Sequence, residues 1–591
     1  MTRSTRVLLG LASVAVAFAA ADTYVVVLAL PEMMTSVGVP IDELQRAAPI
    51  ISGFLLGYVA MLPLIGRIAD LRGRVPVLVM SLMVFAAGSL ITALAYDMSS
   101  MVIGRFLQGV GGGGLVPATL ALVADLFPVE RRGVPLGIVS AVQELGSVAG
   151  PLFGAVVLVF ADWRAIFAIN LAVGLVLAAG IRALADQEST ARGPTTREPT
   201  AGKRRRVPDP VGLLLLAVLL AASAVVLVRP ASLMRDVTWG QVFIPLVGEG
   251  RWLTPVGLVA VAAGLLLLLR CVTTEHPLVD VRAWFRSMVE ADLTGALLLA
   301  VALGGVILAF ATADPEIQVF ADHGHWFLIG SAAASLALVV HLRRSSRPLV
   351  PRGALRRTPA WGALVVSFFV GSALIAALID IPLFARTTIY PDSQLMAALV
   401  LVRFLVALPV GAVIGGYLLR RVGAGTVTAA GMGLAALGFW LMSRWDITAL
   451  EHWSSTVALV VAGFGFGLAL APVNASVLAS TDHQVHGLAS ALVVVARMVG
   501  MLVGISALTT IGLRRYYAEQ SDLPSVREVC DGASRCEAFT VLLKQAGIAQ
   551  EQAVFQGAAI CAVLGALLAL VLFRGAQTRG LNTSELVRQA G

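Results

Sequence analysis

The chain has 591 residues, of which 58% are hydrophobic and only 13% charged, and its mean hydropathy is +0.88. Soluble domains carry about 25% charged residues, so this composition excludes an ordinary soluble protein and predicts an integral membrane protein. The net charge of +8 does not indicate nucleic-acid binding, because most arginines lie in short segments between apolar runs.

The apolar runs predict an all-α polytopic membrane protein, since a helix of about 20 residues crosses a hydrocarbon core of roughly 30 Å. The first run is too long for a signal-peptide core and lacks a cleavage site, so it is read as a span. Arginine-rich segments such as RIADLRGR (67–74) place both termini in the cytoplasm, with the chain a multi-pass protein of the plasma (inner) membrane. About sixteen spans are expected, at 7–30, 48–65, 76–95, 102–123, 134–159, 165–184, 210–228, 253–271, 291–312, 326–342, 360–384, 394–419, 425–443, 456–480, 488–512 and 552–573.

The middle of the chain resembles a duplicated helical hairpin. Asp209-Pro-Val-Gly opens one apolar pair and Asp292-Leu-Thr-Gly opens the next, and the two pairs close with HPLVDVRAWFR and RPLVPRGALRR. Chance similarity among leucine-rich helices is the alternative. The expected organisation is a six-helix half at 1–185, a cytosolic linker with two inserted hairpins at 186–358, and a second six-helix half at 359–591 with an extracytoplasmic segment near 513–551.

The loop after the second span carries a specific motif. Its sequence runs from Gly66 through Asp70 and Gly73 to Arg74, and it resembles the G-x-x-x-D-x-x-G-R signature of the major facilitator superfamily. Glycine allows a tight turn between helices, and Asp70 can cap a helix start. Arg74 could reach Asp125 at the end of the fourth span, forming a cytoplasmic gate that closes in one state and opens in the other. The alternative is an ordinary charged turn.

Two further motifs follow in the order that the superfamily has them. Arg105 opens an R-x-x-Q-G stretch, whose arginine the resemblance links to proton coupling; snorkelling of Arg105 to the outer interface is the alternative. Gly146, Gly150, Pro151 and Gly154 in the fifth span resemble the antiporter motif of drug:proton exporters. Small residues there let another helix approach closely, and simple helix packing is the alternative.

Several other stretches narrow the resemblance to one branch, the mycobacterial triacylglyceride and multidrug exporters that work with a periplasmic lipoprotein. Residues 162–170 resemble a stretch common in the 14-span branch of drug:proton exporters, which implies two six-helix bundles joined by one linker hairpin. With two hairpins, this chain is expected to have about four inserted linker helices. The chain departs from the branch in its second inserted hairpin, and Arg420 stands where a second signature loop would have aspartate. The stretches that carry the resemblance are 162–170, 22–27, 143–148, 407–412 and 495–501.

Five ionisable residues lie deep in predicted spans, namely Asp22, Glu144, Asp380, Arg403 and Arg497. Such residues are rare in membranes and mark functional sites by default. Glu144 could pair with Arg403 across the two halves, or reach Arg497, and its proton could then move in step with the motion of the halves. A static buried ion pair is the alternative for Glu144 and Asp22. Asp380, near the outer end of its span, favours a structural role.

Cys530 and Cys536 lie in the long segment 513–551, which the predicted orientation places outside. Outside compartments are oxidising, so these cysteines either form a disulfide or remain two free thiols. The last two spans could extend outward as helices here and offer a lipid chain a path to a carrier.

The sequence contains no nucleotide-binding loop of the G-x-x-x-x-G-K-[ST] type and no recognisable metal motif among its scattered histidines. The prediction is therefore a secondary transporter, not an enzyme, with no metal and no cofactor beyond the proton gradient. It would export a lipophilic small molecule or lipid such as triacylglyceride, with a periplasmic lipoprotein as a partner. A general multidrug:proton antiporter without a lipid role is the first alternative. An intramembrane lipid-modifying enzyme and a non-transporting sensor are remote ones.

Overall fold

The computed structural model describes most of the chain, and every regular element in those residues is a helix. All sixteen predicted spans fall on helices, so the predicted fold class is confirmed. The predicted linker motif KRRR (203–206) lies outside the described residues. Those residues are 3–39, 44–191, 209–229, 231–236, 239–246, 251–274, 277–311, 324–391, 393–521, 523–530 and 536–578.

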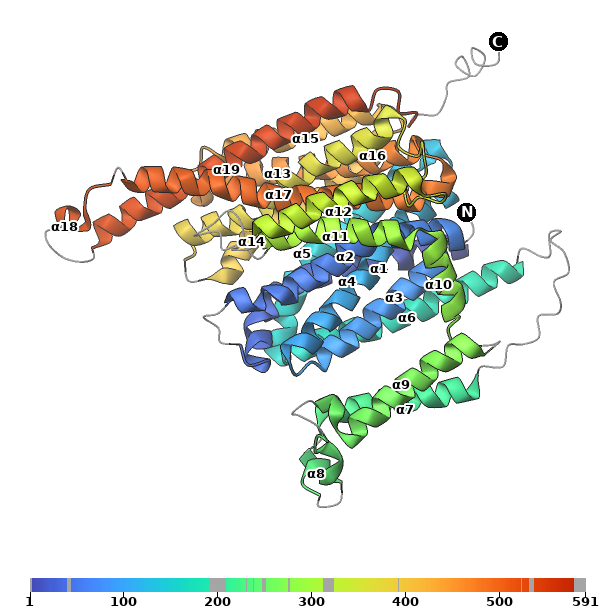
Figure 1. Cartoon of the computed structure of the whole chain (residues 1–591). Helices are drawn as coiled ribbons and strands as arrows, with labels where there is room; N and C mark the ends of the chain where they lie inside the picture. Colours follow the sequence, from blue (N-terminus) through green and yellow to red (C-terminus); the bar gives the residue numbers. More distant parts are fainter. Residues whose placement is uncertain are drawn as a thin grey trace, which may run out of the picture.

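Six long helices form the first half of the bundle (Figure 1). A helix satisfies its own backbone hydrogen bonds, which lipid cannot do, and this explains why apolar runs adopt it here. Within this half α1 packs on α5 and α6, α3 packs on α4 and α6, and α2 packs on α4. The six helices are α1 (Arg3–Ser36), α2 (Leu44–Arg72), α3 (Arg74–Ala93), α4 (Met98–Leu126), α5 (Gly133–Phe160) and α6 (Trp163–Ala191).

The last six long helices form the second half, in which α14 and α15 pack on α16 while α13 packs on α17 and α19. The two halves meet where α5 packs on α14 and where α2 packs on α17. Counting from the start of each half, these are the second and fifth helices, so the two contacts are equivalent. The helices are α13 (Thr358–Thr388), α14 (Gln394–Leu418), α15 (Ala424–Met442), α16 (Trp453–Ala479), α17 (His486–Ser521), the one-turn α18 (Val526–Val529) and α19 (Glu537–Leu572).

Fourteen helices in the described residues are long and apolar enough to cross a membrane. A fifteenth span is made by α10 (Val281–Glu290) and α11 (Leu293–Ala311) if they are counted together, although the chain bends by 73° between them. The 28 residues of α5 are also sufficient for a span. The protein is therefore a multi-pass membrane protein.

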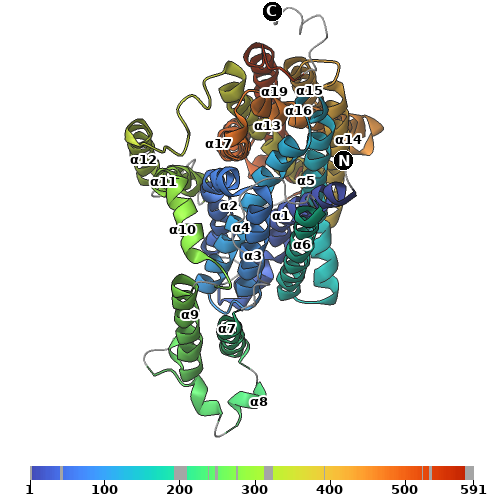
Figure 2. The same ribbon diagram turned by 90° about the vertical axis from the view of Figure 1, so that its right-hand side faces the viewer.

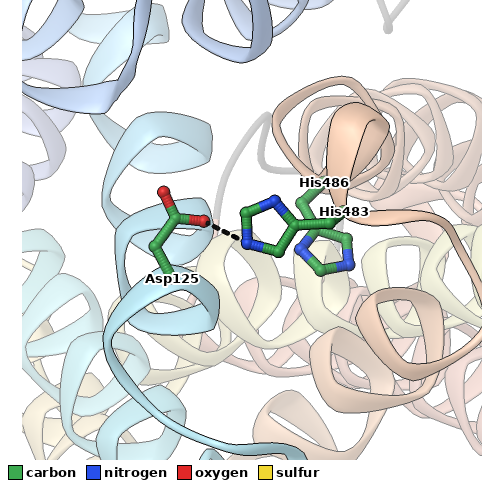
Figure 3. A group of neighbouring side chains, drawn as sticks. All are labelled: Asp125, His483 and His486. Carbon is green, nitrogen blue, oxygen red and sulfur yellow. Dashed lines mark ion pairs between the residues drawn. The ribbon is translucent and has the colours of Figure 1, made fainter. Parts of the chain in front are cut away.

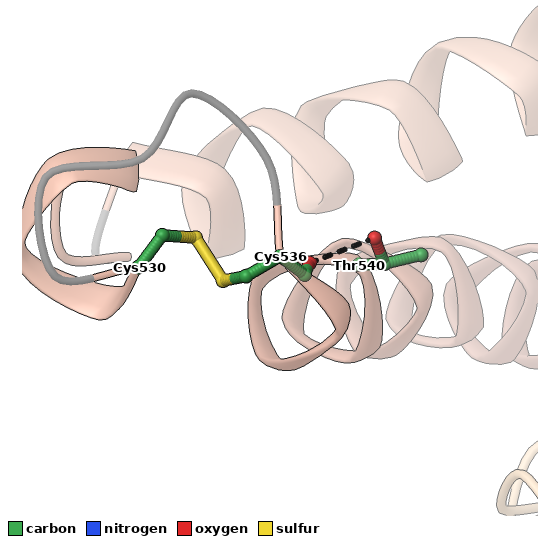
Figure 4. Close-up of a disulfide and its surroundings, with 3 residues drawn as sticks. All are labelled: Cys530, Cys536 and Thr540. Atoms are coloured by element: carbon green, nitrogen blue, oxygen red, sulfur yellow. Dashed lines mark hydrogen bonds between the residues drawn. A yellow bond between two sulfur atoms is a disulfide. The ribbon is translucent and has the colours of Figure 1, made fainter.

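We call the two ends of the helix bundle the gate face and the distal face. The gate face carries the loop between α2 and α3, and the distal face is the opposite end, beyond which α17 and α19 continue (Figure 1). Each of these helices has 36 residues and is about 54 Å long at ~1.5 Å per residue. Near their tips Cys530 and Cys536 form a disulfide (Figure 4).

Two helical hairpins are inserted between the halves, and the same local arrangement closes each of them. In the first, Arg270 on α9 (Pro255–Thr273) donates to both carboxylate oxygens of Asp209, just before α7 (Pro210–Val228). These hydrogen bonds lower the pKa of the Asp209 carboxyl. In the second, His341 on α12 (Gly324–Arg344) lies 2.7 Å from the Asp292 carboxylate, just before α11. Asp209 and Asp292 therefore occupy corresponding positions in the two hairpins.

The two hairpins differ in how they contact the bundle. The α11/α12 hairpin packs on α2, and an apolar cleft of about 400 Å³ lies between it and α2 and α4. The α7/α9 hairpin lies beside the bundle, where the Arg251 guanidinium stacks on the Tyr96 ring at 4.0 Å, and the one-turn α8 (Ala231–Met234) lies beyond its far end (Figure 2). Between the hairpins, α10 crosses the gate face, where its Trp284 ring stacks under the Arg72 guanidinium and its Ser287 accepts from Arg72 Nε at 2.6 Å.

Candidate functional site

The predicted gate residues gather at the gate face. Asp70 Oδ1 accepts from the Gly487 amide at 2.8 Å, and Oδ2 accepts from the Leu488 amide at 3.0 Å. These amides belong to the first turn of α17, where a helix has unpaired N–H groups and a partial positive charge. Arg74 donates to Asp70 and lies 3.3 Å from Asp125 Oδ2. Sequence reasoning proposed the Asp70–Arg74–Asp125 group but missed the α17 terminus, the part that joins the two halves.

Glycines bring the halves into backbone contact here. A Cβ at Gly66 on α2 would lie 2.6 Å from the Gly487 carbonyl oxygen, and one at Gly133 on α5 would lie 2.5 Å from the Gly416 oxygen on α14. Gly73 has a φ of +93°, which only glycine adopts readily, and it allows α3 to begin directly after α2. The structure is thus the state in which the halves are closed at the gate face.

Arg132 is a gate residue that sequence reasoning missed. It donates to the Ala124 and Phe127 carbonyl oxygens at 2.7 and 2.9 Å and so satisfies the end of α4. Burial lowers the pKa of the Arg132 guanidinium, and the carboxylates of Asp125 and Glu130 oppose that shift. The Ala124 and Phe127 carbonyl groups flank Asp125, which lies on the last turn of α4.

A buried polar cluster lies inside the first half. Arg105 Nη1 lies 2.7 Å from Asp22 Oδ2 and donates to Gln108 Oε1 at 3.0 Å. Asn170 and Gln108 donate to the other Asp22 oxygen. Only 1% of the Arg105 side chain is exposed, so the snorkelling alternative is wrong. An arginine inside a membrane helix needs a partner, and Asp22 is that partner.

The antiporter motif is a contact surface between α5 and α1. A Cβ at Gly146 would lie 2.2 Å from the Ala17 carbonyl oxygen, and one at Gly150 would lie 2.4 Å from the Ala21 oxygen. Gly154 faces Val25 in the same way, one turn further along. The side chain of Pro151 lies outside the described residues. This close packing holds α5 against the helix that carries Asp22.

Glu144 is on the opposite side of α5 from this contact and faces the second half. Its Oε1 lies 3.8 Å from Arg497 Nη1 on α17. Both side chains line a cavity of about 40 Å³ between the halves, together with Tyr58, Gln143 and Ser147. This volume holds water but not a lipid, so a cargo requires the halves to move. The pair ties α5 to α17 through charge.

Arg403 is not part of this pair. Its Nη1 donates to Thr456 on α16 at 3.0 Å. The sequence suggested Arg403 or Arg497 as the partner of Glu144, and in this structure the partner is Arg497.

The second half contains a pair of buried carboxyl side chains, of which sequence reasoning considered only Asp380. Asp380 on α13 and Glu551 on α19 are both buried, and they lie close enough to influence each other's ionisation. Glu551 was missed because residues 513–551 were expected to form an extracytoplasmic segment. Two neighbouring buried carboxylates repel each other when both are ionised.

Comparison with known proteins agrees with this architecture. The family profile of the Major Facilitator Superfamily matches residues 12–505. A triacylglyceride transporter of Mycolicibacterium hassiacum is 34% identical, over 94% of this chain and 90% of its own. A triacylglyceride transporter of Mycobacteroides abscessus is 35% identical, over 87% of this chain and 84% of its own. A probable triacylglyceride transporter of Mycobacterium leprae is 33% identical, over 96% of both chains.

Among solved structures, a human organic anion transporter has a TM-score of 0.53 at 15% identity, covering 96% of this chain and 100% of its own. That likeness concerns the fold alone. The profile match spans both halves and the inserted hairpins between them. The chain therefore belongs to the major facilitator superfamily and is a membrane transporter.

Proposed function

We propose that this transporter exports a lipidic cargo of the triacylglyceride class by proton antiport, alternating between states open at one face and then the other. The observation that carries the proposal is the Glu144–Arg497 pair, a carboxylate and a cation from opposite halves that line the same cavity. The cargo is proposed from the relatives, which are named triacylglyceride transporters. The apolar character of the walls around that cavity fits a lipid better than a sugar.

The coupling follows from charge. While Glu144 is ionised it attracts Arg497 and holds α5 near α17. A proton that reaches Glu144 from the distal face removes this attraction and allows the halves to separate at the other end. When the pair forms again, the proton is released towards the gate face. Each turn of the cycle would thus carry a proton inward and leave the cavity free to move cargo outward.

The Asp22–Arg105 cluster supports this motion as a fixed part of the first half. Its ion pair and hydrogen bonds join α1, α4 and α6, and Gln108 also donates to Ser89 on α3, so all of these contacts lie within the first half. We propose that it keeps α1 in register with α5, so that movement of Glu144 moves the half as one body.

We further propose that the gate face is cytoplasmic and that the membrane is the plasma (inner) membrane. Arginines concentrate in the loops at this face, which is the pattern that sets orientation during insertion. This places both chain ends in the cytoplasm and the α17/α19 extension outside, where a periplasmic lipoprotein could receive the cargo.

The test uses proteoliposomes that contain the native chain, Glu144→Gln, or Glu32→Gln as the matched control on an exposed carboxylate of α1. A proton gradient is imposed, and a fluorescent triacylglyceride and a lipophilic cationic dye are followed in parallel. We expect gradient-driven lipid movement with the native chain and the control, and its loss with Glu144→Gln. Movement of the dye alone would indicate a multidrug antiporter. Gradient-independent movement of both would show that proton coupling is wrong.

A further inference from the structure

Three metal-ligating side chains from opposite halves converge at the gate face (Figure 3). Asp125 lies on the last turn of α4, while His483 and His486 lie just before and at the start of α17. One donor atom from each lies within 4.8 Å of the other two. His483 Nε2 is 3.2 Å from Asp125 Oδ1. Neither imidazole contacts Asp70 in the described hydrogen bonds, and within the described residues His486 has no ion pair with the gate carboxylates.

His486 supplies an independent indication of a ligand. The side chain is buried, with 3% of its surface exposed, and its Nδ1 has no hydrogen-bond partner. Its Nε2 lies 3.3 Å from the Thr481 carbonyl oxygen, which can only accept, so the ring proton belongs on Nε2. This tautomer leaves a lone pair on the buried Nδ1. Metal-binding histidines are typically oriented in this way, with the other ring nitrogen donating to a carbonyl.

The surrounding charges leave room for a cation. Arg74 contacts Asp125 Oδ2, while His483 contacts the other oxygen of that carboxylate, Oδ1. Arg74 is itself paired with Asp70. Arg132 and Arg67 are further nearby cations; Glu130 precedes Arg132 in the same loop, and Arg67 donates to the Gln484 carbonyl oxygen at 3.1 Å. These three arginines face the carboxylates of Asp70, Asp125 and Glu130, so the positive charges around the site are matched by negative ones.

We propose that Asp125, His483 and His486 form a binding site for a divalent transition-metal ion of the Zn²⁺ class. Two imidazoles and one carboxylate, with water as a fourth ligand, form a set that Zn²⁺ takes in tetrahedral geometry, whereas Mg²⁺ and Ca²⁺ prefer oxygen ligands. The donor atoms must approach to about 3.4 Å of one another for tetrahedral bonds of ~2.1 Å. His483 can make this movement because 64% of its side chain is exposed, which also gives the ion access.

The site exists only when the halves are closed at the gate face, because Asp125 belongs to the first half and both histidines to the second. An ion that binds one state stabilises that state by mass action, by about 100-fold in population at 100 times its dissociation constant. The metal would therefore act as a brake, holding the transporter closed at this face and slowing its cycle.

The test measures binding directly, on the purified full-length chain freed of any oligohistidine tag. Zn²⁺ is titrated against a metallochromic chelator, and the melting temperature is recorded with and without Zn²⁺. The variants are His483→Asn, His486→Asn and the matched control His452→Asn, an exposed histidine at the other end of the bundle. We expect one Zn²⁺ per native or control chain and a raised melting temperature. Affinity should fall at least 10-fold in the two site variants, and Mg²⁺ should have no effect.

His483→Asn is decisive, because an exposed side chain can be replaced without unfolding the protein, whereas the buried His486 could be required for folding. Equal Zn²⁺ affinity in the native chain and His483→Asn, or no stoichiometric binding to the native chain, would overturn the proposal. In the proteoliposome assay, Zn²⁺ at the gate face should slow transport by the native chain at least 5-fold more than by His483→Asn. Since binding is measured without transport, failure of the export proposal would leave this result interpretable.

Discussion

At the scale of single residues, Arg105 is a large charged side chain that the described structure buries almost completely. Its guanidinium is bonded to Asp22 and Gln108 and lies 4.4 Å from the centroid of the Phe54 ring. Removing one partner of a buried ion pair typically costs about 3–5 kcal/mol, because the other charge stays buried without compensation. The cluster therefore stabilises the first half only while it is complete.

We predict that Asp22→Asn lowers the stability of the protein by about 3 kcal/mol or more. The double variant Asp22→Asn/Arg105→Gln should recover most of this loss, because it removes both charges. Thermal unfolding in detergent measures the two effects. If the double variant were as unstable as the single one, hydrogen-bond geometry rather than charge would explain the cluster.

For the Asp380–Glu551 pair, unlike the Asp22–Arg105 pair, we predict that a single amide substitution has little effect on stability. A glutamine amide can donate to the Asp380 carboxylate as a protonated Glu551 would, so Glu551→Gln should alter stability by less than about 1 kcal/mol. Glu551→Leu, which cannot donate, should cost about 1–3 kcal/mol by leaving Asp380 buried without a partner. Equal, large losses in both variants would show that the pair is ionised and needs its charge.

These residues also show what the sequence could and could not predict at this scale. Asp70 and Arg74 were predicted because a local motif of fixed spacing contains them. The pairing of Asp22 with Arg105 was not, because the residues are 83 positions apart and no pattern within either helix relates them. Asn170 was part of a recognised stretch, yet only the packing of α6 on α1 reveals that it donates to Asp22.

At the scale of helices, close approach between α1 and α5 depends on glycine. A Cβ at Gly150 would meet the Ala21 carbonyl oxygen at 2.4 Å, far inside van der Waals contact, so one of the two helices must shift. By contrast Gly433 on α15 has nothing within 4 Å of such a Cβ.

We predict that Gly150→Ala destabilises the protein by about 1–3 kcal/mol through overpacking. The matched control Gly433→Ala should be neutral or stabilising by up to about 1 kcal/mol, because alanine favours helix more than glycine does. Urea or thermal unfolding of the two variants tests this. Equal effects would show that the α1–α5 contact yields easily to an added methyl group.

Helix positions were predicted from apolar runs, but those runs did not give the exact helix ends, although the extension of the last two spans as helices was proposed and is confirmed. The run ends near residue 512, yet α17 continues to Ser521, and α19 begins at Glu537 although its apolar run starts only near 552. Polar residues end a membrane span, but a helix continues in water where another helix packs against it, as α17 and α19 do. The helix α10 was missed for a related reason, since its ten residues are too few for a span.

At the scale of the whole molecule, the α17/α19 extension is the largest feature that reaches beyond the bundle. Its two helices exceed a roughly 30 Å hydrocarbon core by more than 20 Å if they stand upright. The Cys530–Cys536 disulfide joins the end of the one-turn α18 to the residue before α19. A projection of this size is suited to passing a cargo to a carrier outside the bilayer.

We predict that replacing residues 516–545 with a short linker abolishes lipid export, while membrane insertion and stability remain close to those of the native chain. Lipid transfer from cells or proteoliposomes, measured beside the insertion level of the protein, tests this. The disulfide variant Cys530→Ser/Cys536→Ser serves as a milder control, which should keep most activity. Full export by the shortened chain would show that the extension is dispensable.

The closing of each inserted hairpin by its own aspartate has a consequence for how such a chain can lengthen. A hairpin begins and ends on the same side, so inserting one leaves the direction of α13–α19 unchanged, whereas a single added helix would reverse it. Reversal would move the start of α17 to the far side of the bilayer, about 30 Å from Asp70. Insertions between the halves are therefore restricted to even numbers of membrane-spanning helices. Because Asp209 and Asp292 each close their own hairpin, one hairpin could be gained or lost without changing the direction in which the other helices cross the membrane.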